Sequence, residues 1–232
     1  MRTAPFTAIL LLAVTLGACG QKSGQEGHKD LDWPTFVQQF ADSWMEAHPM
    51  MAFALGRKEF AGRFPDWSPQ GIAAEIARLK AIAGEAKAFD AGKLTEAQRF
   101  ERDYLLAVVD RNLFWLERAE WPFRNPTFYF DWNLDFLSPD PYLTKPYAPL
   151  DQRLRDFTLW LSNVPTATAQ IKANLRTPMP RTWIDQGIAS FGGMVGFLRD
   201  DAPQVFADVK DTALQNAYGE SNKKAVAALK EL

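Results

Sequence analysis

Apolar residues recur every three or four positions through nearly all of the chain from residue 30 onward, and no run of alternating β-branched residues interrupts them. Such a spacing is typical of amphipathic helices, whereas exposed strands alternate with a period of two. The sequence therefore predicts an all-α fold: a multi-helix bundle of antiparallel helices with one long loop rich in proline and aromatic residues.

Start and stop signals predict three helices in the first half of this body. The first carries Phe36, Phe40 and Trp44 at i, i+4 and i+8, can be capped by Asp32, and ends before Pro49. It is an ordinary amphipathic helix in its spacing, with one apolar stripe.

The second and third helices have clearer signals. Ser68, followed by a proline, predicts the start of the second, which Gly92 would end in a left-handed cap. Thr95 and Gln98 have the spacing of a capping box and predict the start of the third. Apolar residues occupy nearly every face between 104 and 116, so we expect this third helix to be central and surrounded by others.

Further helices are expected at residues 150–163, 166–175, 181–198, 203–218 and 223–232, with proline or glycine at most joints. The fourth of these has a predicted buried stripe made of Phe206, Val209, Ala213 and Ala217. The last has only ten residues and no C-cap signal, so it looks like an unfinished helix.

The first residues have the order of a bacterial lipoprotein signal. Arg2 supplies positive charge, residues 6–16 form an apolar run of eleven, and Leu-Gly-Ala-Cys follows at 16–19. An ordinary secretory cleavage site needs a small residue where Leu16 stands, while a lipobox tolerates leucine there. A membrane-spanning anchor would need about 20 apolar residues. The predicted organisation is a signal peptide at 1–18, a flexible tether at 19–31 and a helical domain at 32–232.

Lipidation is predicted at Cys19, the only thiol in the chain. Several acyl chains on this residue would give stable anchoring, with membrane lipid as the partner. Gly20 is not the aspartate that retains lipoproteins in the inner membrane of enteric bacteria. We therefore expect an exported protein that is lipid-anchored to the cell envelope, in the outer membrane and facing the periplasm.

Composition argues against several classes of function. Lys plus Arg at 26 against Asp plus Glu at 28 gives a net charge of −2, so no nucleic-acid partner is expected. The two histidines, His28 and His48, lack the spacing of a ligand pair, so no metal residue and no cofactor is predicted in this chain. The common hydrolase and phosphate-loop motifs do not occur either, so no catalytic residue is predicted.

The segment 122–149 combines six prolines with eight aromatic residues and cannot be a regular helix. Long loops often carry function. One interpretation is a ligand wall made of Phe128, Tyr129, Phe130, Asp131, Trp132, Asp135, Phe136 and Tyr142. Asp131 and Asp135 could also be the acid/base pair of a glycan-active enzyme. The alternative is that the rings cap the bundle and the aspartates fix turns.

Three glycines, Gly192, Gly193 and Gly196, fall inside an otherwise apolar helix. Each costs about 1 kcal/mol relative to alanine in such a position. Close packing against another helix is the first explanation, and approach of the backbone to a ligand is the alternative.

Several short motifs occur at 48–49 (His-Pro), 53–56 (Phe-Ala-Leu-Gly), 64–68 (Phe-Pro-Asp-Trp-Ser), 103–104 (Asp-Tyr) and 161–165 (Leu-Ser-Asn-Val-Pro). Together they resemble those of bacterial proteins called domain of unknown function 885. The resemblance covers the chain from about residue 33 to its end. It implies a large, mostly helical, exported protein, similar in architecture to zinc metallopeptidases of the helical carboxypeptidase type.

In those proteins the metal-binding motif lies in the C-terminal half, and no position here matches it. No catalytic or metal residue is carried over, and zinc is expected only in a full-length protein. The first hypothesis is that residues 33–232 are the N-terminal helical lobe of such a protein, with peptide substrate or a C-terminal lobe as partner. The alternative is a complete small lipoprotein that binds a ligand or partner through the aromatic segment 122–149.

Overall fold

The computed structural model of the protein describes residues 31–130 and 136–232, and these residues form helices, turns and loops without a strand. The predicted all-α class is therefore confirmed. Six long helices dominate the described part: α1 (Trp33–Ala47), α3 (Pro69–Ala88), α4 (Glu96–Leu113), α7 (Leu150–Asn174), α8 (Arg181–Asp200) and α10 (Thr212–Lys230). Shorter elements join them: α2 (Pro49–Ala54), η1 (Lys58–Phe60), η2 (Phe114–Arg118), α5 (Trp121–Arg124), η3 (Pro126–Phe130), α6 (Asp140–Thr144) and α9 (Ala202–Val205).

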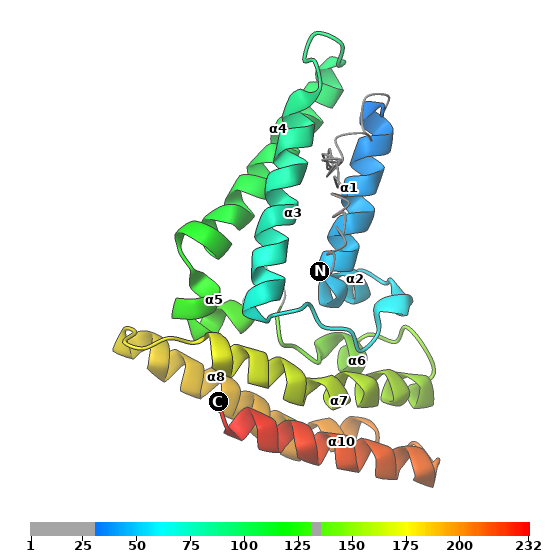
Figure 1. The fold of residues 1–232 in the computed structure, drawn as a ribbon. Coiled ribbons are helices and arrows are strands. Elements are labelled where there is room, and N and C mark those ends of the chain that lie inside the picture. The colour runs from blue at the N-terminus through cyan, green and yellow to red at the C-terminus, as the bar shows by residue number, and fades with distance from the viewer. Residues whose placement is uncertain (1–30, 131–135) are drawn as a thin grey trace, which may run out of the picture. The chain divides into compact units, whose positions relative to one another are not determined.

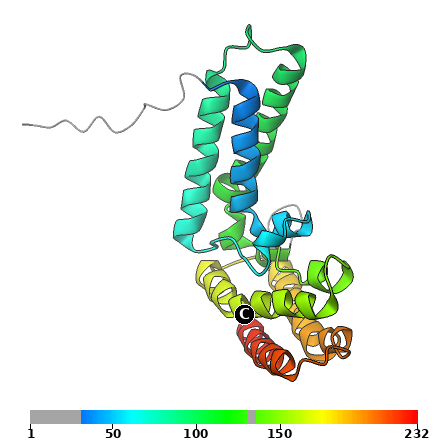
Figure 2. The same cartoon turned by 90° about the vertical axis from the view of Figure 1, so that its right-hand side faces the viewer.

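The long helices of the unit Trp33–Leu232 form two groups (Figure 1). Helices α1, α3 and α4 run side by side in one group, and α7, α8 and α10 form a layer that crosses their ends. Within the layer, each successive long helix reverses direction, so that α8 lies antiparallel to α7 and to α10. Figure 2 shows the same division from the side, with α5 and α6 near the boundary between the group and the layer.

Local capping signals positioned two helices as predicted. Ser68 Oγ accepts a hydrogen bond from Gly71 N at 3.0 Å, and α3 begins at the next residue. Thr95 Oγ1 accepts from Gln98 N at 3.2 Å, while Gln98 Oε1 accepts from Thr95 N at 3.0 Å. These bonds satisfy amide groups that the first helical turn leaves without partners.

The predicted end of α3 was wrong. The helix ends at Ala88, Phe89 adopts extended backbone, and Gly92 does not have the positive φ of a left-handed cap. Instead the turn is closed by Asp90, whose Oδ1 accepts from Gly92 N at 2.9 Å. A side chain thus replaced the backbone cap that the glycine suggested.

The predicted break at Pro165 was also wrong, because α7 runs through it without interruption. A proline inside a helix costs about 3 kcal/mol, since its ring displaces one backbone hydrogen bond. On both sides of it the side chains of Leu161, Val164 and Ile171 are completely buried. Burial of this continuous face outweighs the local cost.

The helix predicted at 203–218 does not exist as such. Helix α9 stops at Val205, and α10 starts after Asp211, whose side chain accepts from Leu214 N at 3.0 Å. Phe206 and Val209 are buried from the connecting turns, but Ala213 and Ala217 are exposed. A cap at Asp211 therefore overrode the apolar spacing.

The last helix was expected to have ten residues, and this length was wrong. Helix α10 has 19 residues. Its last turn closes with the Glu231 amide donating to Ala228 O at 3.2 Å.

Aromatic rings fill the core of the layer. The Phe157 ring lies 5.8 Å from Trp160, 5.7 Å from Phe206 and 5.9 Å from Tyr218, measured between ring centroids. The Tyr142 ring, from α6, completes the cluster at 5.9 Å from Phe157. All five side chains are buried, so residues from four elements share one apolar core.

Helix α4 is not surrounded, contrary to the prediction. Leu105 and Val109 are buried on one side, but Phe100 is 72% exposed and Tyr104 is 65% exposed. The reason is that α4 packs mainly against α3 and the following turn, which leaves its opposite side in solvent.

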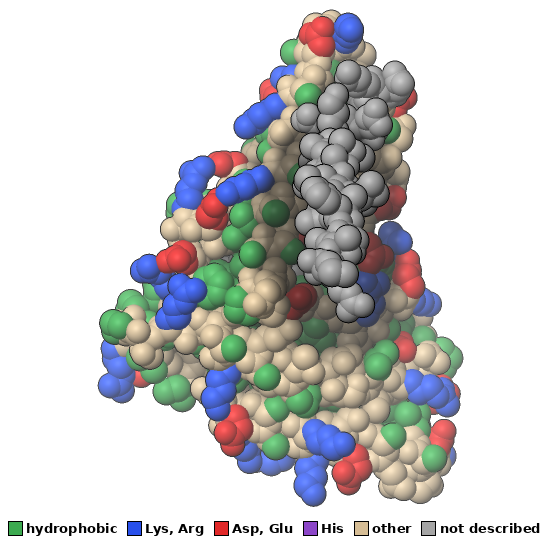
Figure 3. Space-filling view, in the orientation of Figure 1, with side chains coloured by type: hydrophobic (Ala, Val, Ile, Leu, Met, Phe, Trp, Pro, Cys, Tyr) green, Lys and Arg blue, Asp and Glu red, His purple; other side chains and the backbone are tan. Residues whose placement is uncertain are grey.

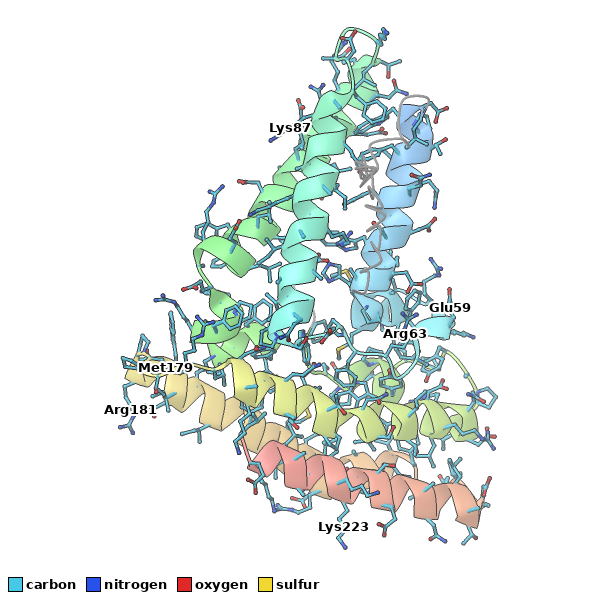
Figure 4. The ribbon with its side chains drawn as sticks, viewed as in Figure 1. Glu59, Arg63, Lys87, Met179, Arg181 and Lys223 are labelled. Atoms are coloured by element: carbon cyan, nitrogen blue, oxygen red, sulfur yellow. The ribbon has the colours of Figure 1, made fainter. Side chains whose placement is uncertain are left out.

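Charged side chains of both signs alternate over the outer surface shown in Figure 3. In Figure 4, Lys87 at the far end of α3 and Lys223 on α10 point away from the helices. The mixture of positive and negative side chains agrees with the small net charge of the chain. No large patch of one charge forms on this face.

Candidate functional site

A cavity of about 360 Å³ lies where α1 ends, α3 begins and α4 ends. Aromatic and aliphatic side chains form most of its wall, namely Phe64, Trp67, Ile72, Leu116 and Phe128. Small-molecule sites in proteins have this size range and this mainly apolar lining.

The segment before α3 is held in place by α7. Gln170 Oε1 accepts from Trp67 N at 3.0 Å, and Gln170 Nε2 donates to Asp66 Oδ1 at 2.9 Å. Asn174 Nδ2 donates to Trp67 O at 2.6 Å. These bonds hold the backbone of Trp67 to α7, and the Trp67 ring contacts Tyr129 edge to face at 5.2 Å. This part of the cavity wall is therefore hydrogen-bonded to α7.

Two of the carboxylates at the cavity are neutralised by arginine. Glu75 and Arg78, on one face of α3, form a bidentate salt bridge with both N···O distances at 2.7 Å. Arg78 Nη1 also donates to Ser43 Oγ at 3.1 Å. Glu46 pairs with Arg63 at 2.7 Å. Neither carboxylate therefore leaves uncompensated charge at the cavity.

Asp66 differs from these two because no Lys or Arg lies within ion-pair distance of it in the described structure. Its Oδ1 accepts from Ser68 N at 2.9 Å as well as from Gln170. The backbone bond from Ser68, first among the causes, lowers the pKa of Asp66 below its ordinary value. The carboxylate thus stays ionised at neutral pH and carries the unpaired charge of the site.

Asn112 is the one amide that lines the cavity among the residues described. Only 2% of it is exposed. Its Nδ2 donates to Val108 O at 2.8 Å, and this hydrogen bond compensates part of the cost of burying the amide.

His48 also lines the cavity, and its ring packs on Trp44 with centroids 4.3 Å apart. His48 Nε2 lies 3.8 Å from Glu75 Oε1. Across residues 31–130 and 136–232, no three His, Cys, Asp or Glu side chains gather as metal ligands would.

Of the predicted ligand wall, Phe128 lines this cavity. Tyr129 and Tyr142 are buried elsewhere in the core: Tyr129 OH donates to Pro122 O at 2.8 Å, and Tyr142 OH accepts from Gly62 N at 2.8 Å. Burial raises the pKa of both hydroxyls well above its ordinary value.

Phe130 contacts Phe191 at 4.7 Å between centroids, and Phe136 is half-buried. Three further residues of the predicted wall, and the predicted lipidation site, lie outside the described residues: Asp131, Trp132, Asp135 and Cys19.

The glycines of α8 do not have the role that their spacing suggested. A Cβ atom added at Gly192, Gly193 or Gly196 would meet nothing within 4 Å, so close helix packing is wrong as an explanation. The glycine that does pack closely is Gly187, where an added Cβ would lie 2.8 Å from Pro126 Cγ.

Sequence reasoning missed the cavity and most of its polar residues. One signal was available: Asn112 interrupts an apolar stretch, as Asp110 and Arg111 do. The structure distinguishes them, since Asp110 and Arg111 are exposed while Asn112 is buried. A single polar residue among apolar ones is thus informative only when its exposure is known.

None of the helices in the described part of the chain is both long and apolar enough to span a membrane. No curated protein matches the chain. A solved structure, described as "a putative lipoprotein of unknown function" from Shewanella oneidensis, is similar with a TM-score of 0.75 and 19% sequence identity.

That match covers 87% of this chain but only 36% of the Shewanella protein, so this chain spans about a third of its length. At this identity the likeness shows the fold. The family of bacterial proteins of unknown function called DUF885 matches residues 49–232, and the chain therefore belongs to that family.

Proposed function

We propose that the protein is an envelope-anchored lipoprotein whose helical body is the N-terminal lobe of a metallopeptidase-like protein. The observation that carries the proposal is that this almost entirely helical chain matches only 36% of the length of the solved Shewanella protein. The lipobox ending at Cys19 and the description of the relative as a lipoprotein both support the anchor.

In this proposal the lobe binds and positions the peptide substrate but does not hydrolyse it. A hydrolytic zinc site needs three protein ligands and an activated water. The described residues offer no such group, so the ligands would come from a C-terminal lobe. The lobe described here would cover one side of a peptide-binding cleft, and acylated Cys19 would hold it to the periplasmic face of the outer membrane.

The lobe is tested with the full chain, purified from membranes in detergent. We expect no stoichiometric zinc by elemental analysis and no hydrolysis of a mixed peptide library. One zinc per chain, together with peptide cleavage that a chelator abolishes, would contradict the proposal.

The anchor is tested separately by labelling cells with radioactive palmitate. The chain should take up label and fractionate with membranes, while the Cys19→Ser variant should do neither. Equal labelling of both chains would show that the lipid is not on Cys19.

A second candidate is a binding module that uses the aromatic segment 122–149. Tyr129 and Tyr142 already use their hydroxyls inside the core. Among the residues described, this candidate therefore depends on Phe128, Phe130 and Phe136. Loss of ligand binding in a Phe136→Ala variant, without loss of stability, would favour it.

A further inference from the structure

We infer that the exposed side of α4 binds the same side of α4 in a second copy of the chain, as an antiparallel helix pair. The inference does not depend on the proposed function, because it rests on the residues of one helix face. Three properties of that face lead to it: a row of exposed positions, charges that differ between its two halves, and a small residue at its centre.

The row of exposed positions has the spacing of a helix-packing seam. Phe100, Tyr104, Ala107, Arg111 and Phe114 follow one another at intervals of four, three, four and three residues. This alternation keeps side chains along one line of a helix, as in coiled coils. All five are exposed. Single apolar residues are normal on a surface, whereas a continuous row of them marks an interaction site.

The aromatic residues of the row supply the attraction. The rings of Phe100 and Tyr104 stack on each other with centroids 6.5 Å apart. Phe114, the first residue of the turn that continues α4, is 42% exposed. Removing such rings from water is favourable, and paired rings contribute beyond their buried area.

A two-fold axis at Ala107 makes the row complementary to itself. In an antiparallel pair, each residue lies opposite the residue at the same distance on the other side of the axis. Phe100 and Phe114 are each seven residues from Ala107, so Phe100 of one copy would lie against Phe114 of the second copy. The small side chain of Ala107 lets the two helices approach closely at their crossing point.

Charge selects the antiparallel orientation. Glu96 and Asp103 lie in the first half of the exposed side, and Arg111 and Arg118 lie in the second half. The axis at Ala107 places Asp103 opposite Arg111 of the second copy, and Glu96 opposite Arg118 of the second copy. A parallel pair would instead bring like charges together, which is unfavourable.

The ion pairs already present on this side are weak. Arg118 pairs with Asp110 at 3.2 Å, and Arg102 pairs with Asp103 at 3.3 Å. The carboxylate side chains are 68% exposed in Asp110 and 69% exposed in Asp103. Exposed pairs contribute little to stability, so a second copy can replace them at small cost.

A lipid surface is the main rival, since exposed aromatic residues also bind membranes. Helices that lie on a membrane carry Lys and Arg beside their apolar face. The exposed side of α4 instead carries Glu96, Asp103 and Asp110 as well as Arg111 and Arg118. These carboxylates favour a protein surface of mixed charge over a membrane surface.

Sedimentation equilibrium on the full chain in detergent tests the inference. One pair of helices is small beside the roughly 1,600 Å² of a standard interface, so we expect a reversible equilibrium of monomer and dimer. Arg111→Asp would face Asp103 of the second copy and should raise the dissociation constant at least about tenfold. A wild-type chain that stays monomeric at every concentration would overturn the inference, as would an Arg111→Asp variant that dimerises like the wild type.

A charge exchange is the matched control. Asp103→Arg combined with Arg111→Asp restores opposite charges across the axis and should restore the wild-type dissociation constant. If the double variant dimerises no better than Arg111→Asp, the antiparallel pairing is wrong. At protein concentrations below the dissociation constant, all of these chains should unfold at nearly the same urea concentration, because α4 then has the same side in solvent.

Disulfide cross-linking locates the contact and its orientation. In the Cys19→Ser chain, which has no other thiol, Ala107→Cys puts two thiols at the two-fold axis and should give a covalent dimer on mild oxidation. Ala97→Cys, at another exposed position of α4, is the control. Ten residues on each side of the axis separate its two copies by about 30 Å, so it should not cross-link.

The remaining outcomes separate the second copy from other occupants of this face. Cross-linking through both positions would indicate a parallel pair, and cross-linking through neither would place the contact elsewhere, so either result contradicts the inference. A chain that stays monomeric but floats with phosphatidylcholine vesicles would show that α4 faces lipid, and it too would overturn the inference.

Discussion

The layer of α7, α8 and α10 and the group of α1, α3 and α4 use the same kinds of residue to opposite effect. In the layer, Phe157 and Trp160 on α7 are completely buried, and rings from α6, α10 and the turn after α9 surround them. On α4, Phe100 and Tyr104 lie largely in solvent. The difference shows that apolar spacing predicts a helix but not how many of its sides have a partner.

The two regions should therefore depend on different sources of stability. The layer gains from burial, which contributes about 25 cal/mol per Å² of apolar surface. Helix α4 has less burial and relies more on its capping box and on surface pairs such as Asp110 with Arg118. Each prediction below measures one side of this contrast.

The largest effect is expected from Phe157→Ala. Removing a buried phenylalanine leaves a cavity, and such changes cost about 3–5 kcal/mol. The matched control is Phe100→Ala, which removes the same side chain at 72% exposure and should change stability by less than about 0.5 kcal/mol. Urea unfolding followed by circular dichroism measures both. Similar losses in the two variants would mean that α4 is covered in solution.

Two glycine-to-alanine variants should have smaller effects on stability, and these effects should have opposite signs. Gly62 has φ of 74°, and a Cβ there would lie 2.4 Å from Leu159 Cγ. Gly62→Ala should therefore destabilise by at least about 1–2 kcal/mol. Gly192 lies in α8 with open space around it, so Gly192→Ala should stabilise by up to about 1 kcal/mol. If Gly192→Ala destabilises, something outside the described residues contacts that face.

The capping box at the start of α4 should matter next. Thr95→Ala removes the acceptor of the Gln98 amide and should cost about 1 kcal/mol. Amide hydrogen exchange should then speed up in the first turn of α4 more than in α7. Thr95→Ser, which keeps the hydroxyl, is the control and should exchange as the wild type does.

These cases show which parts of the fold were predictable from sequence. The starts at Ser68 and Thr95 were, because each depends on residues within three positions of the cap. The course of α7 through Pro165 was not, because it depends on burial against α10 and other elements. The start of α10 at Asp211 was missed although its cap is local, because the apolar spacing of residues 203–218 continues through Asp211 and suggested one unbroken helix.

The cavity was less predictable than the fold. Its residues come from five separate stretches of sequence, so no spacing rule connects Asn112 with Asp66 or Trp67. The role of Asp66 depends on Gln170, more than a hundred positions away. Conversely, the aromatic segment 122–149 attracted attention by composition, yet Tyr129 and Tyr142 lie in the core.

The smallest effect is expected where the two regions are joined, at Asp66. Its pKa is lowered in the folded state by the Ser68 amide, so ionised Asp66 stabilises the fold at pH values above the ordinary aspartate pKa of about 3.9. That contribution is lost as pH falls through the lowered value. Because the carboxylate is exposed and screened by solvent, the loss should be less than about 1 kcal/mol.

The Asp66→Asn variant tests this contribution, because asparagine keeps an acceptor oxygen for Ser68 and Gln170 but removes the charge. The stability of wild type and Asp66→Asn should therefore differ slightly at pH 7 and converge toward pH 2. A difference that persists unchanged at pH 2 would mean that the hydrogen bonds of Asp66, and not its charge, join the group of α3 to the layer of α7.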